Sequence, residues 1–190
     1  MKELLSNPEK TALRKMLLEK RDSTSFDLIQ IHSEKIYSRL KKIKSFIDAN
    51  SIGCYYSIGS EVQTKSIILD LLNQKKHVSL PKMVNDIIVF RAIKNFNKLE
   101  KGNFGILEPR DDWPEEKSFD VILVPAIGLT KDGVRLGYGH GYYDKFLADK
   151  SVTKIALTYN KQIIKSIPAS EHDIKMDWII SESESILISE

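Results

Sequence analysis

The sequence has very little cysteine: Cys54 is the only one among 190 residues. A single cysteine excludes both a disulfide within the chain and a zinc site built from cysteines of one chain. Cys54 lies in an apolar stretch, so we expect a buried and unreactive thiol.

Long apolar runs are also missing. No run approaches the roughly 18 residues of a membrane-spanning helix. The first ten residues, MKELLSNPEK, lack the apolar centre of a signal peptide. The sequence therefore predicts a cytoplasmic protein without membrane contact.

A large excess of either positive or negative charge is also missing. The chain carries 29 Lys and Arg against 26 Asp and Glu, a net charge of +3, without a long run of like charges. This mild excess suits a small anionic substrate and argues against a nucleic-acid partner. A hydrophobic content of 42% is typical of soluble globular proteins. We expect one domain covering residues 1–190, and a monomer.

The most informative stretch runs from Val121 to Leu147. It opens with the apolar run Val121–Val124, which is rich in β-branched residues and too short for a helix, so it predicts a strand buried on both faces. Residues 142–147 read as the first turns of a helix. Between them lies a glycine-rich segment that contains Gly133, Gly137, Gly139 and Gly141.

A strand, a glycine loop and a helix in this order can bind phosphate. Glycine lets backbone N–H groups approach an anion, and a helix N-terminus adds unpaired donors. Arg135, which we expect on a surface loop, can add a bidentate guanidinium. The spacing fits neither the dinucleotide fingerprint nor the Walker lysine loop. By glycine spacing alone, phosphate binding and a tight left-handed connection are equally good interpretations; the neighbouring arginine, tyrosines and aspartate favour phosphate.

Two helices are predicted before the first strand. Asn7 is the expected N-cap of the first, which runs to about Arg21 with Pro8 at its first position. Lys10 and Arg14 are four residues apart and share one face of this helix. Their spacing alone favours a solvated basic face. The second helix is predicted over residues 26–44.

Strands and helices alternate along the rest of the chain. A capping-box pattern at residues 60–63 predicts a helix through residue 72, and a short helix is expected over residues 161–167. Residues 95–117 read as a long loop. The expected strands cover residues 51–56, 77–81, 87–93, 121–124, 152–159, 178–180 and 186–188. This pattern predicts an α/β fold, a single three-layer α/β/α domain with a largely parallel sheet.

Glu61 follows the first predicted strand. One interpretation is a carboxylate that complements the positive end of the next helix. The other is a ligand-facing carboxylate, because open α/β sheets bind ligands beyond the carboxyl ends of their strands.

Residues 135–144, RLGYGHGYYD, resemble the signature of the 5-formyltetrahydrofolate cyclo-ligases, also called methenyltetrahydrofolate synthetases. The family pattern is a proline-ended strand followed by G-x-R-L-G-x-G-x-G-Y-Y-D. The resemblance covers nearly the whole chain. Three further features agree in the same order: Lys10-x-x-x-Arg14, Ser60-Glu61-Val62 and Glu171-His172-Asp173.

This resemblance implies an ATP-dependent ring closure that requires Mg²⁺. The formyl group on N5 of reduced folate is closed onto N10, which gives 5,10-methenyltetrahydrofolate, ADP and phosphate. Phosphorylation turns the poor amide oxygen into a leaving group. The implied partners are ATP and 5-formyltetrahydrofolate; the sequence does not decide whether the folate carries a polyglutamate tail.

The resemblance also assigns residues. Lys10 and Arg135 are implied in catalysis, and Asp144 and Asp173 in holding Mg²⁺, which prefers oxygen ligands. His140 is expected to contribute only its backbone N–H. The residues implied to bind ATP are Lys10, Arg14, Gly133, Arg135, Leu136, Gly137, Tyr138, Gly139, His140, Gly141 and Tyr142. Those implied to bind the folate are Tyr56, Glu61, Tyr138, Gly139, Gly141 and Tyr142.

Two other classes of protein remain open at this point. A different phosphate-handling enzyme, such as a sugar-phosphate isomerase or a CoA-transferase-like domain, could share the anion-binding loop without needing ATP or Mg²⁺. A nucleotide-binding sensor would keep the glycine loop but would not need Glu61 and Asp144.

Overall fold

The computed structural model describes residues 7–102, 105–168 and 170–188. Their main sheet has eight strands in the order β13-β12-β10-β7-β1-β2-β3-β6. Strands β12, β10, β7, β1 and β2 are parallel, which confirms a largely parallel sheet. The bounds are β1 Ser51–Gly53, β2 His77–Val84, β3 Ile87–Ala92, β6 Glu115–Glu116, β7 Val121–Pro125, β10 Thr153–Leu157, β12 Trp178–Ile180 and β13 Ser185–Leu187.

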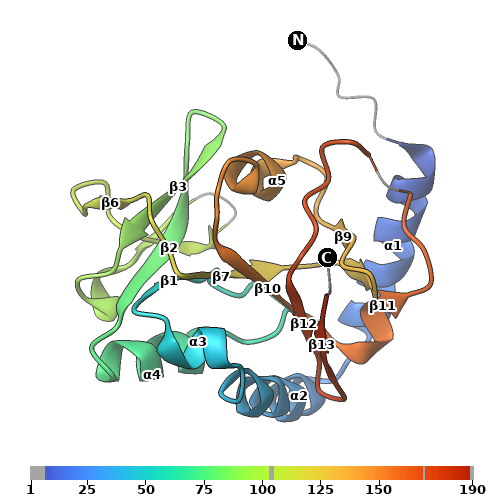
Figure 1. Cartoon of the computed structure of the whole chain (residues 1–190), viewed down its shortest axis with the longest axis horizontal. Coiled ribbons are helices and arrows are strands. Elements are labelled where there is room, and N and C mark those ends of the chain that lie inside the picture. The colour runs from blue at the N-terminus through green and yellow to red at the C-terminus, as the bar shows by residue number, and fades with distance from the viewer. Residues whose placement is uncertain (1–6, 103–104, 169, 189–190) are drawn as a thin grey trace.

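Helices cover both faces of this sheet. Figure 1 shows α2, α3 and α4 on one side and α5 on the other. Strand β7 explains why both faces need cover: Val121 and Leu123 pack into the core under α2–α4, and Ile122 and Val124 into the core under α5. The predicted three-layer α/β/α arrangement is therefore confirmed. The helix bounds are α1 Pro8–Asp22, α2 Phe26–Leu40, α3 Lys44–Asp48, α4 Lys65–Asn73 and α5 Tyr142–Leu147.

Helix α1 packs on a second, smaller sheet. That sheet has the order β11-β8-β9, with β8 at Gly128–Thr130, β9 at Arg135–Leu136 and β11 at Ile163–Ile164. Leu17 of α1 is fully buried against Leu136 and neighbouring apolar residues. Helix α1 is therefore held against the β8–β9 hairpin, which follows β7 in the chain.

The order of the parallel strands fixes where a ligand can bind. Along the chain they are β1, β2, β7, β10 and β12, but β1 lies between β2 and β7 in the sheet. The winding direction therefore reverses between β1 and β7, and such a reversal leaves a binding crevice at the carboxyl ends of the two strands. The segment containing Glu61 and the glycine loop both start at this edge.

Several predicted boundaries are wrong. The second helix ends at Leu40, and a turn separates it from α3. The helix predicted from residue 60 begins only at Lys65, because the Ser60 hydroxyl hydrogen bonds with Arg21 and Asp22 instead of capping a helix. The helix predicted over 161–167 is replaced by a 3₁₀ turn at Asn160–Gln162 and strand β11, which pairs with β8.

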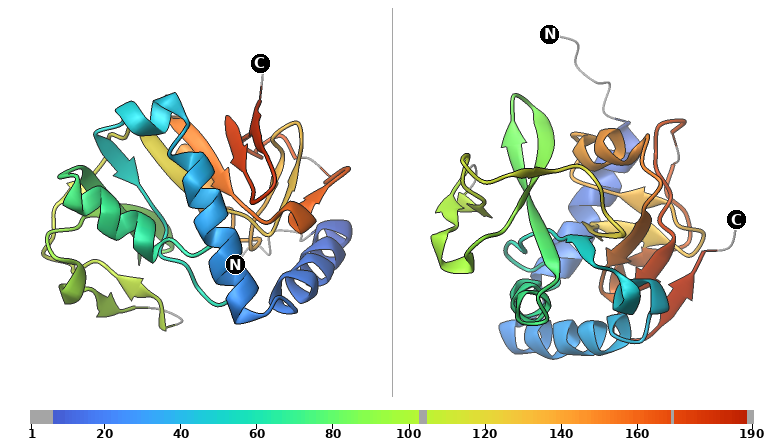
Figure 2. Two further views of the ribbon diagram at one scale, coloured as in Figure 1. Left: turned by 90° about the horizontal axis from the view of Figure 1, so that it is seen from below. Right: turned by 60° about the vertical axis from the view of Figure 1, so that its left-hand side comes forward.

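The predicted long loop also has structure. It contains a 3₁₀ turn at Phe96–Lys98 and the short strands β4 (Glu100–Lys101), β5 (Leu107–Glu108) and β6, while residues 103–104 lie outside the described residues. Figure 1 and the left view of Figure 2 place this segment and α1 on opposite sides of the molecule.

The structure also bears on two expectations, one drawn from the single cysteine and one from the lack of long apolar runs. Cys54 is fully buried, as predicted, and burial raises the pKa of its thiol. In the described part of the chain, the helices are too short or too polar for a bilayer crossing.

Candidate functional site

One face of α1 supplies cations to the site. The Asn7 side chain caps this helix by accepting hydrogen bonds from the backbone N–H groups of Glu9 and Lys10, as predicted. At about 100° per residue, Lys10, Arg14 and Arg21 fall within about 40° of one another and span about 16 Å along the axis. A single helix face therefore carries three cations along the carboxyl edge of the sheet.

Lys10 and Arg14 both contact the rest of the site. The Lys10 Nζ lies 2.6 Å from Oδ2 of Asp173 and donates to the Ser170 hydroxyl at 3.0 Å. The Arg14 Nε donates to the Gly137 carbonyl at 2.8 Å. Lys10 is buried, with 8% of its surface exposed. The prediction from spacing alone, that Lys10 and Arg14 form a solvated basic face, is therefore wrong.

The glycine loop is shaped by two guanidinium groups. A Cβ atom on Gly137 would lie 2.6 Å from Nη1 of Arg135. Gly139 has φ +105°, and a Cβ there would lie 3.2 Å from Cζ of Arg14. Larger residues at these positions would displace the arginines, so glycine is what lets both cations lie against the loop backbone.

Arg135 is buried rather than exposed on a surface loop. Only 6% of its surface is exposed. Its Nη2 pairs with Oδ2 of Asp144 at 2.9 Å, and its Nη1 donates to the Pro125 carbonyl at 3.3 Å. These contacts fix the guanidinium between the end of β7 and the first turn of α5.

Asp144 and Asp173, the predicted metal ligands, lie close together. Oδ1 of Asp144 accepts a 3.4 Å hydrogen bond from the backbone N–H of Ile174, the residue after Asp173. Each carboxylate is also paired with a cation, Arg135 or Lys10. Within residues 7–102, 105–168 and 170–188, groups of three or more His, Cys, Asp or Glu that could hold a metal ion are absent. Two carboxylates still fit Mg²⁺, because this ion commonly uses one or two of them together with substrate phosphates and water.

Glu61 is buried beside Tyr138 of the glycine loop. Its Oε1 accepts a hydrogen bond from the Tyr138 hydroxyl at 2.7 Å, and its Oε2 accepts one from the Ile58 N–H at 3.0 Å. Burial is the main reason why the pKa of this carboxyl is raised. Since α4 begins only at Lys65, complementing a helix dipole does not explain Glu61.

Arg21 completes this cluster, although the sequence patterns did not single it out. Its Nη2 donates to the Tyr138 hydroxyl at 3.1 Å, its Nε donates to the Ser60 hydroxyl at 2.9 Å, and its Nη1 lies 3.9 Å from Oε1 of Glu61. The available signal was its position seven residues, or two helical turns, after Arg14.

Two residues expected to bind ATP also have structural roles. Gly133 forms the turn of the β8–β9 hairpin, and a Cβ there would lie 2.9 Å from the Met176 carbonyl oxygen. Leu136 pairs with Gly128 in the hairpin and packs in the core beside Leu17. The expected contribution of Gly133 and Leu136 to ATP binding stays a prediction.

The remaining predicted residues lie around the loop and beside β1. The His140 ring stacks on that of Tyr142, with ring centres 5.1 Å apart. Gly141 has φ +66° and is the N-cap of α5. Tyr56 lies beyond β1, where its ring centre is 6.2 Å from that of Phe96.

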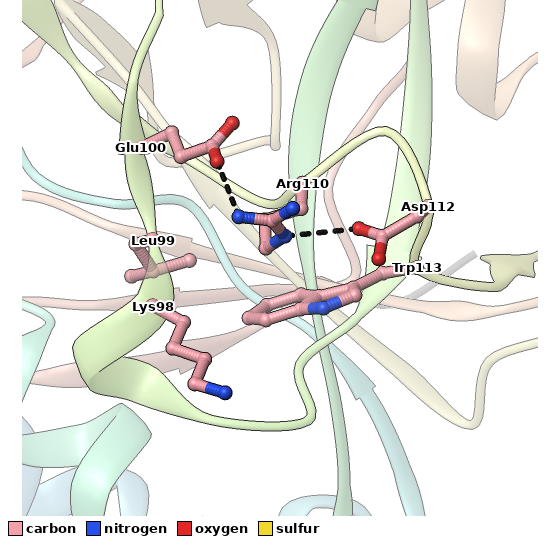
Figure 3. Close-up of a pocket in the computed structure, with 6 residues that line it drawn as sticks. All are labelled: Lys98, Leu99, Glu100, Arg110, Asp112 and Trp113. Carbon is pink, nitrogen blue, oxygen red and sulfur yellow. Dashed lines mark hydrogen bonds and ion pairs between the residues drawn. The ribbon is translucent and has the colours of Figure 1, made fainter.

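A separate pocket of about 550 Å³ lies beside β4 (Figure 3). Arg110 pairs there with Glu100 at 2.6 Å and with Asp112 at 3.0 Å, and Trp113 has only 4% of its surface exposed. Its arginine is already neutralised and its aromatic ring is covered, so this pocket offers less for an anionic or aromatic ligand than the glycine-loop edge.

The chain matches a known protein family over nearly its whole length. The profile of the 5-formyltetrahydrofolate cyclo-ligase family matches residues 6–182, which include every residue assigned to the site. The chain is 29% identical to a probable 5-formyltetrahydrofolate cyclo-ligase of Caenorhabditis elegans, over 94% of this chain and 95% of that protein. It is 30% identical to the cyclo-ligase of Mus musculus, over 91% of this chain and 89% of the mouse protein.

Solved structures show the same likeness. The 5,10-methenyltetrahydrofolate synthetase of Aquifex aeolicus superposes with a TM-score of 0.87 at 30% identity and covers 95% of this chain and 93% of its own. The synthetase of Mycoplasma pneumoniae superposes with a TM-score of 0.75 at 25% identity and covers 92% of this chain and 99% of its own.

Proposed function

Because the chain belongs to the 5-formyltetrahydrofolate cyclo-ligase family, we propose that it closes 5-formyltetrahydrofolate to 5,10-methenyltetrahydrofolate in a reaction that needs ATP and Mg²⁺. One observation carries the proposal. The loop at residues 137–144 joins a cationic cradle, which contains Arg14 and Arg135, to the buried carboxylate of Glu61. Phosphoryl transfer to a folate needs both features side by side. We also propose that the enzyme is a cytoplasmic monomer.

The reaction has two covalent steps. The formyl oxygen on N5 attacks the γ-phosphorus of ATP, the bond to the bridging oxygen breaks, and ADP leaves with the electron pair. N10 then attacks the activated formyl carbon. Phosphate leaves with the electrons of the carbon–oxygen bond, and N10 loses its proton, which gives the methenyl bridge between N5 and N10. Both steps depend on holding two reactants in line, which is what a preorganised site supplies.

The cations act on the phosphates of ATP. Arg14 of α1 and Arg135 of β9 lie against the glycine loop, whose backbone N–H groups can approach the phosphate oxygens, and Lys10 of α1 pairs with Asp173. Arg135 is held in place before substrate binds, so little reorganisation is needed as negative charge moves during transfer.

Asp144 and Asp173 would hold Mg²⁺ together with the phosphates, through the oxygens that their lysine and arginine partners leave available. When bound, the ion would neutralise phosphate charge. The Lys10 and Arg135 pairs meanwhile hold both carboxylates in place beside the loop.

Glu61 is the proposed folate-binding carboxylate. Its two oxygens can accept hydrogen bonds from neighbouring N–H groups on the amino-pyrimidine ring of the pterin. Tyr138, Tyr142 and Tyr56 would contribute stacking or polar contacts to the substrate. The glycines of the loop let the folate and the triphosphate meet without intervening side chains.

The proposal is tested by the absorbance of the product. The protein is mixed with 5-formyltetrahydrofolate and MgATP. We expect a new absorption band at longer wavelength than that of the substrate, because the product contains a conjugated amidine. The band should require both ATP and Mg²⁺. If the protein binds nucleotide but forms no such band, it is not a cyclo-ligase, and the isomerase-like and sensor interpretations take its place.

Replacing Asp144 with asparagine should raise the Mg²⁺ concentration needed for half-maximal activity by about tenfold or more, because a neutral amide is a weaker ligand for this ion. The measurement is a Mg²⁺ titration of turnover at fixed ATP. Asp149→Asn, a change at an exposed residue of the same segment, is the control and should titrate like the original protein. An Asp144→Asn titration identical to that of the control would remove Asp144 from the metal site.

A further inference from the structure

Arg21 has no role in the proposed function, yet its side chain is among the most buried charged groups of the site. Only 5% of Arg21 is exposed, and its Nη1 has no hydrogen-bond partner within the described residues. It lies on the same face of α1 as Lys10 and Arg14, but seven residues further along, where it reaches Glu61 rather than the glycines. A buried donor of this kind is costly unless a ligand uses it.

The Tyr138 hydroxyl shows which kind of group fits between Arg21 and Glu61. It accepts a hydrogen bond from Nη2 of Arg21 at 3.1 Å and donates one to Oε1 of Glu61 at 2.7 Å. The position between these two side chains therefore suits an acceptor on the arginine side and a donor on the carboxylate side. Tyr138 is the most exposed of the three, at 43%, so it is the member that a ligand can displace.

A lactam presents this pair of groups on adjacent atoms. The pyrimidine ring of a reduced folate carries a carbonyl oxygen at C4, an N–H at position 3 and an amino group at C2. A guanidinium can donate to the carbonyl while a carboxylate accepts from the two neighbouring N–H groups. Nη1 of Arg21, which lies 3.9 Å from Oε1 of Glu61 and makes no hydrogen bond within the described residues, is a further donor at this position.

We propose that Arg21 and Glu61 together read the lactam edge of the pterin, and that the Tyr138 hydroxyl occupies the place of this edge before substrate binds. This inference rests on the proposed function and adds a specificity-determining residue to it. A 4-amino-4-deoxy pterin would present a donor to the Arg21 guanidinium and, at position 3, a ring nitrogen acceptor to the Glu61 carboxylate. The Arg21 contact and one of the two Glu61 contacts would be lost, and only the amino group at C2 would still donate to Glu61.

The first test needs no variant. Dissociation constants of the unmodified protein are measured by calorimetry for 5-formyltetrahydrofolate and for its 4-amino-4-deoxy analogue. We expect the lactam form to bind about 100-fold more tightly or better, because a buried site with mismatched donors and acceptors rejects the analogue. Equal affinities would overturn the proposal.

Variants then assign the preference to Arg21. Arg21→Met should lose most of the discrimination between the two folates while its affinity for MgATP is unchanged. Arg21→Lys keeps the charge but not the planar pair of donors, so it should retain the fold and recover only part of the preference. Lys20→Met, a change at the exposed neighbour on α1, should behave like the original protein.

The outcomes separate this inference from the proposed function. If the unmodified protein forms the methenyl product and both Arg21 variants keep the full preference for the lactam, only the role of Arg21 is overturned. If the unmodified protein neither binds nor cyclises 5-formyltetrahydrofolate, the proposed function falls and this inference with it.

Discussion

Replacing Arg135 with lysine should reduce the turnover of 5-formyltetrahydrofolate about 1,000-fold, equivalent to about 4 kcal/mol of transition-state stabilisation. Lysine keeps one positive charge beside Asp144 but cannot bind that carboxylate, the Pro125 carbonyl and a phosphate oxygen at the same time. The measurement is kcat from the rate at which the methenyl band appears, at saturating folate and MgATP.

Lysine is a better replacement than alanine at this position. Arg135 is buried, so truncating it would leave Asp144 without its cation and would lower stability as well as activity. Arg110→Lys is the matched control, because Arg110 also pairs with carboxylates but lies outside the site. Thermal unfolding should show that both variants fold. A kcat for Arg135→Lys within about tenfold of the original would show that the guanidinium is not needed for phosphoryl transfer.

Replacing Glu61 with glutamine should weaken the binding of 5-formyltetrahydrofolate about 100- to 1,000-fold, because charge-assisted hydrogen bonds to two donors are lost in a buried site. Glutamine has nearly the same shape, and its carbonyl oxygen can still accept from Tyr138, so the fold should persist. Binding is measured by calorimetry for the folate and separately for MgATP, whose affinity should not change.

The pH dependence of folate binding provides a second measurement for Glu61. Burial raises the pKa of its carboxyl, so as the pH falls the group takes up a proton at a higher pH than an exposed glutamate would. A protonated carboxyl loses acceptor strength, and the affinity for folate should therefore fall with decreasing pH through this raised pKa.

Two controls make the Glu61 prediction specific. Glu61→Gln should lose this part of the pH profile, and Glu115→Gln, a change at an exposed glutamate, should keep it. If Glu61→Gln binds folate as tightly as the original protein at neutral pH, Glu61 does not recognise the pterin, and the lactam contact assigned to Arg21 loses its partner.

The sequence by itself determined the features that depend on near neighbours. The run Val121–Val124 is a buried strand because consecutive apolar, β-branched residues can cover both faces of a sheet. Asn7 and Pro8 start a helix because their side chains satisfy or replace the free N–H groups of its first turn. The resemblance at residues 135–144 carried the family, and the family match confirms it.

Where local signals compete, sequence patterns were less reliable. The Ser60 hydroxyl could cap a helix, but Arg21 and Asp22 take it as a hydrogen-bond partner instead. Residues 163–164 carry two isoleucines that pack as a strand because β8 offers them a free edge. Tertiary partners of this kind override local preference, which differs between residues by well under about 1 kcal/mol for most side chains.

Only the tertiary structure decided which charged groups meet. Lys10 and Asp173 are 163 residues apart in sequence, Arg21 and Tyr138 are 117 apart, and Glu61 and Tyr138 are 77 apart. These pairs form because the sheet reverses its winding between β1 and β7 and brings α1, Glu61 and the glycine loop to one edge. A helical repeat could place Arg21 on the face of Lys10 and Arg14, but only the packing of α1 against the β8–β9 hairpin turned that face toward the site.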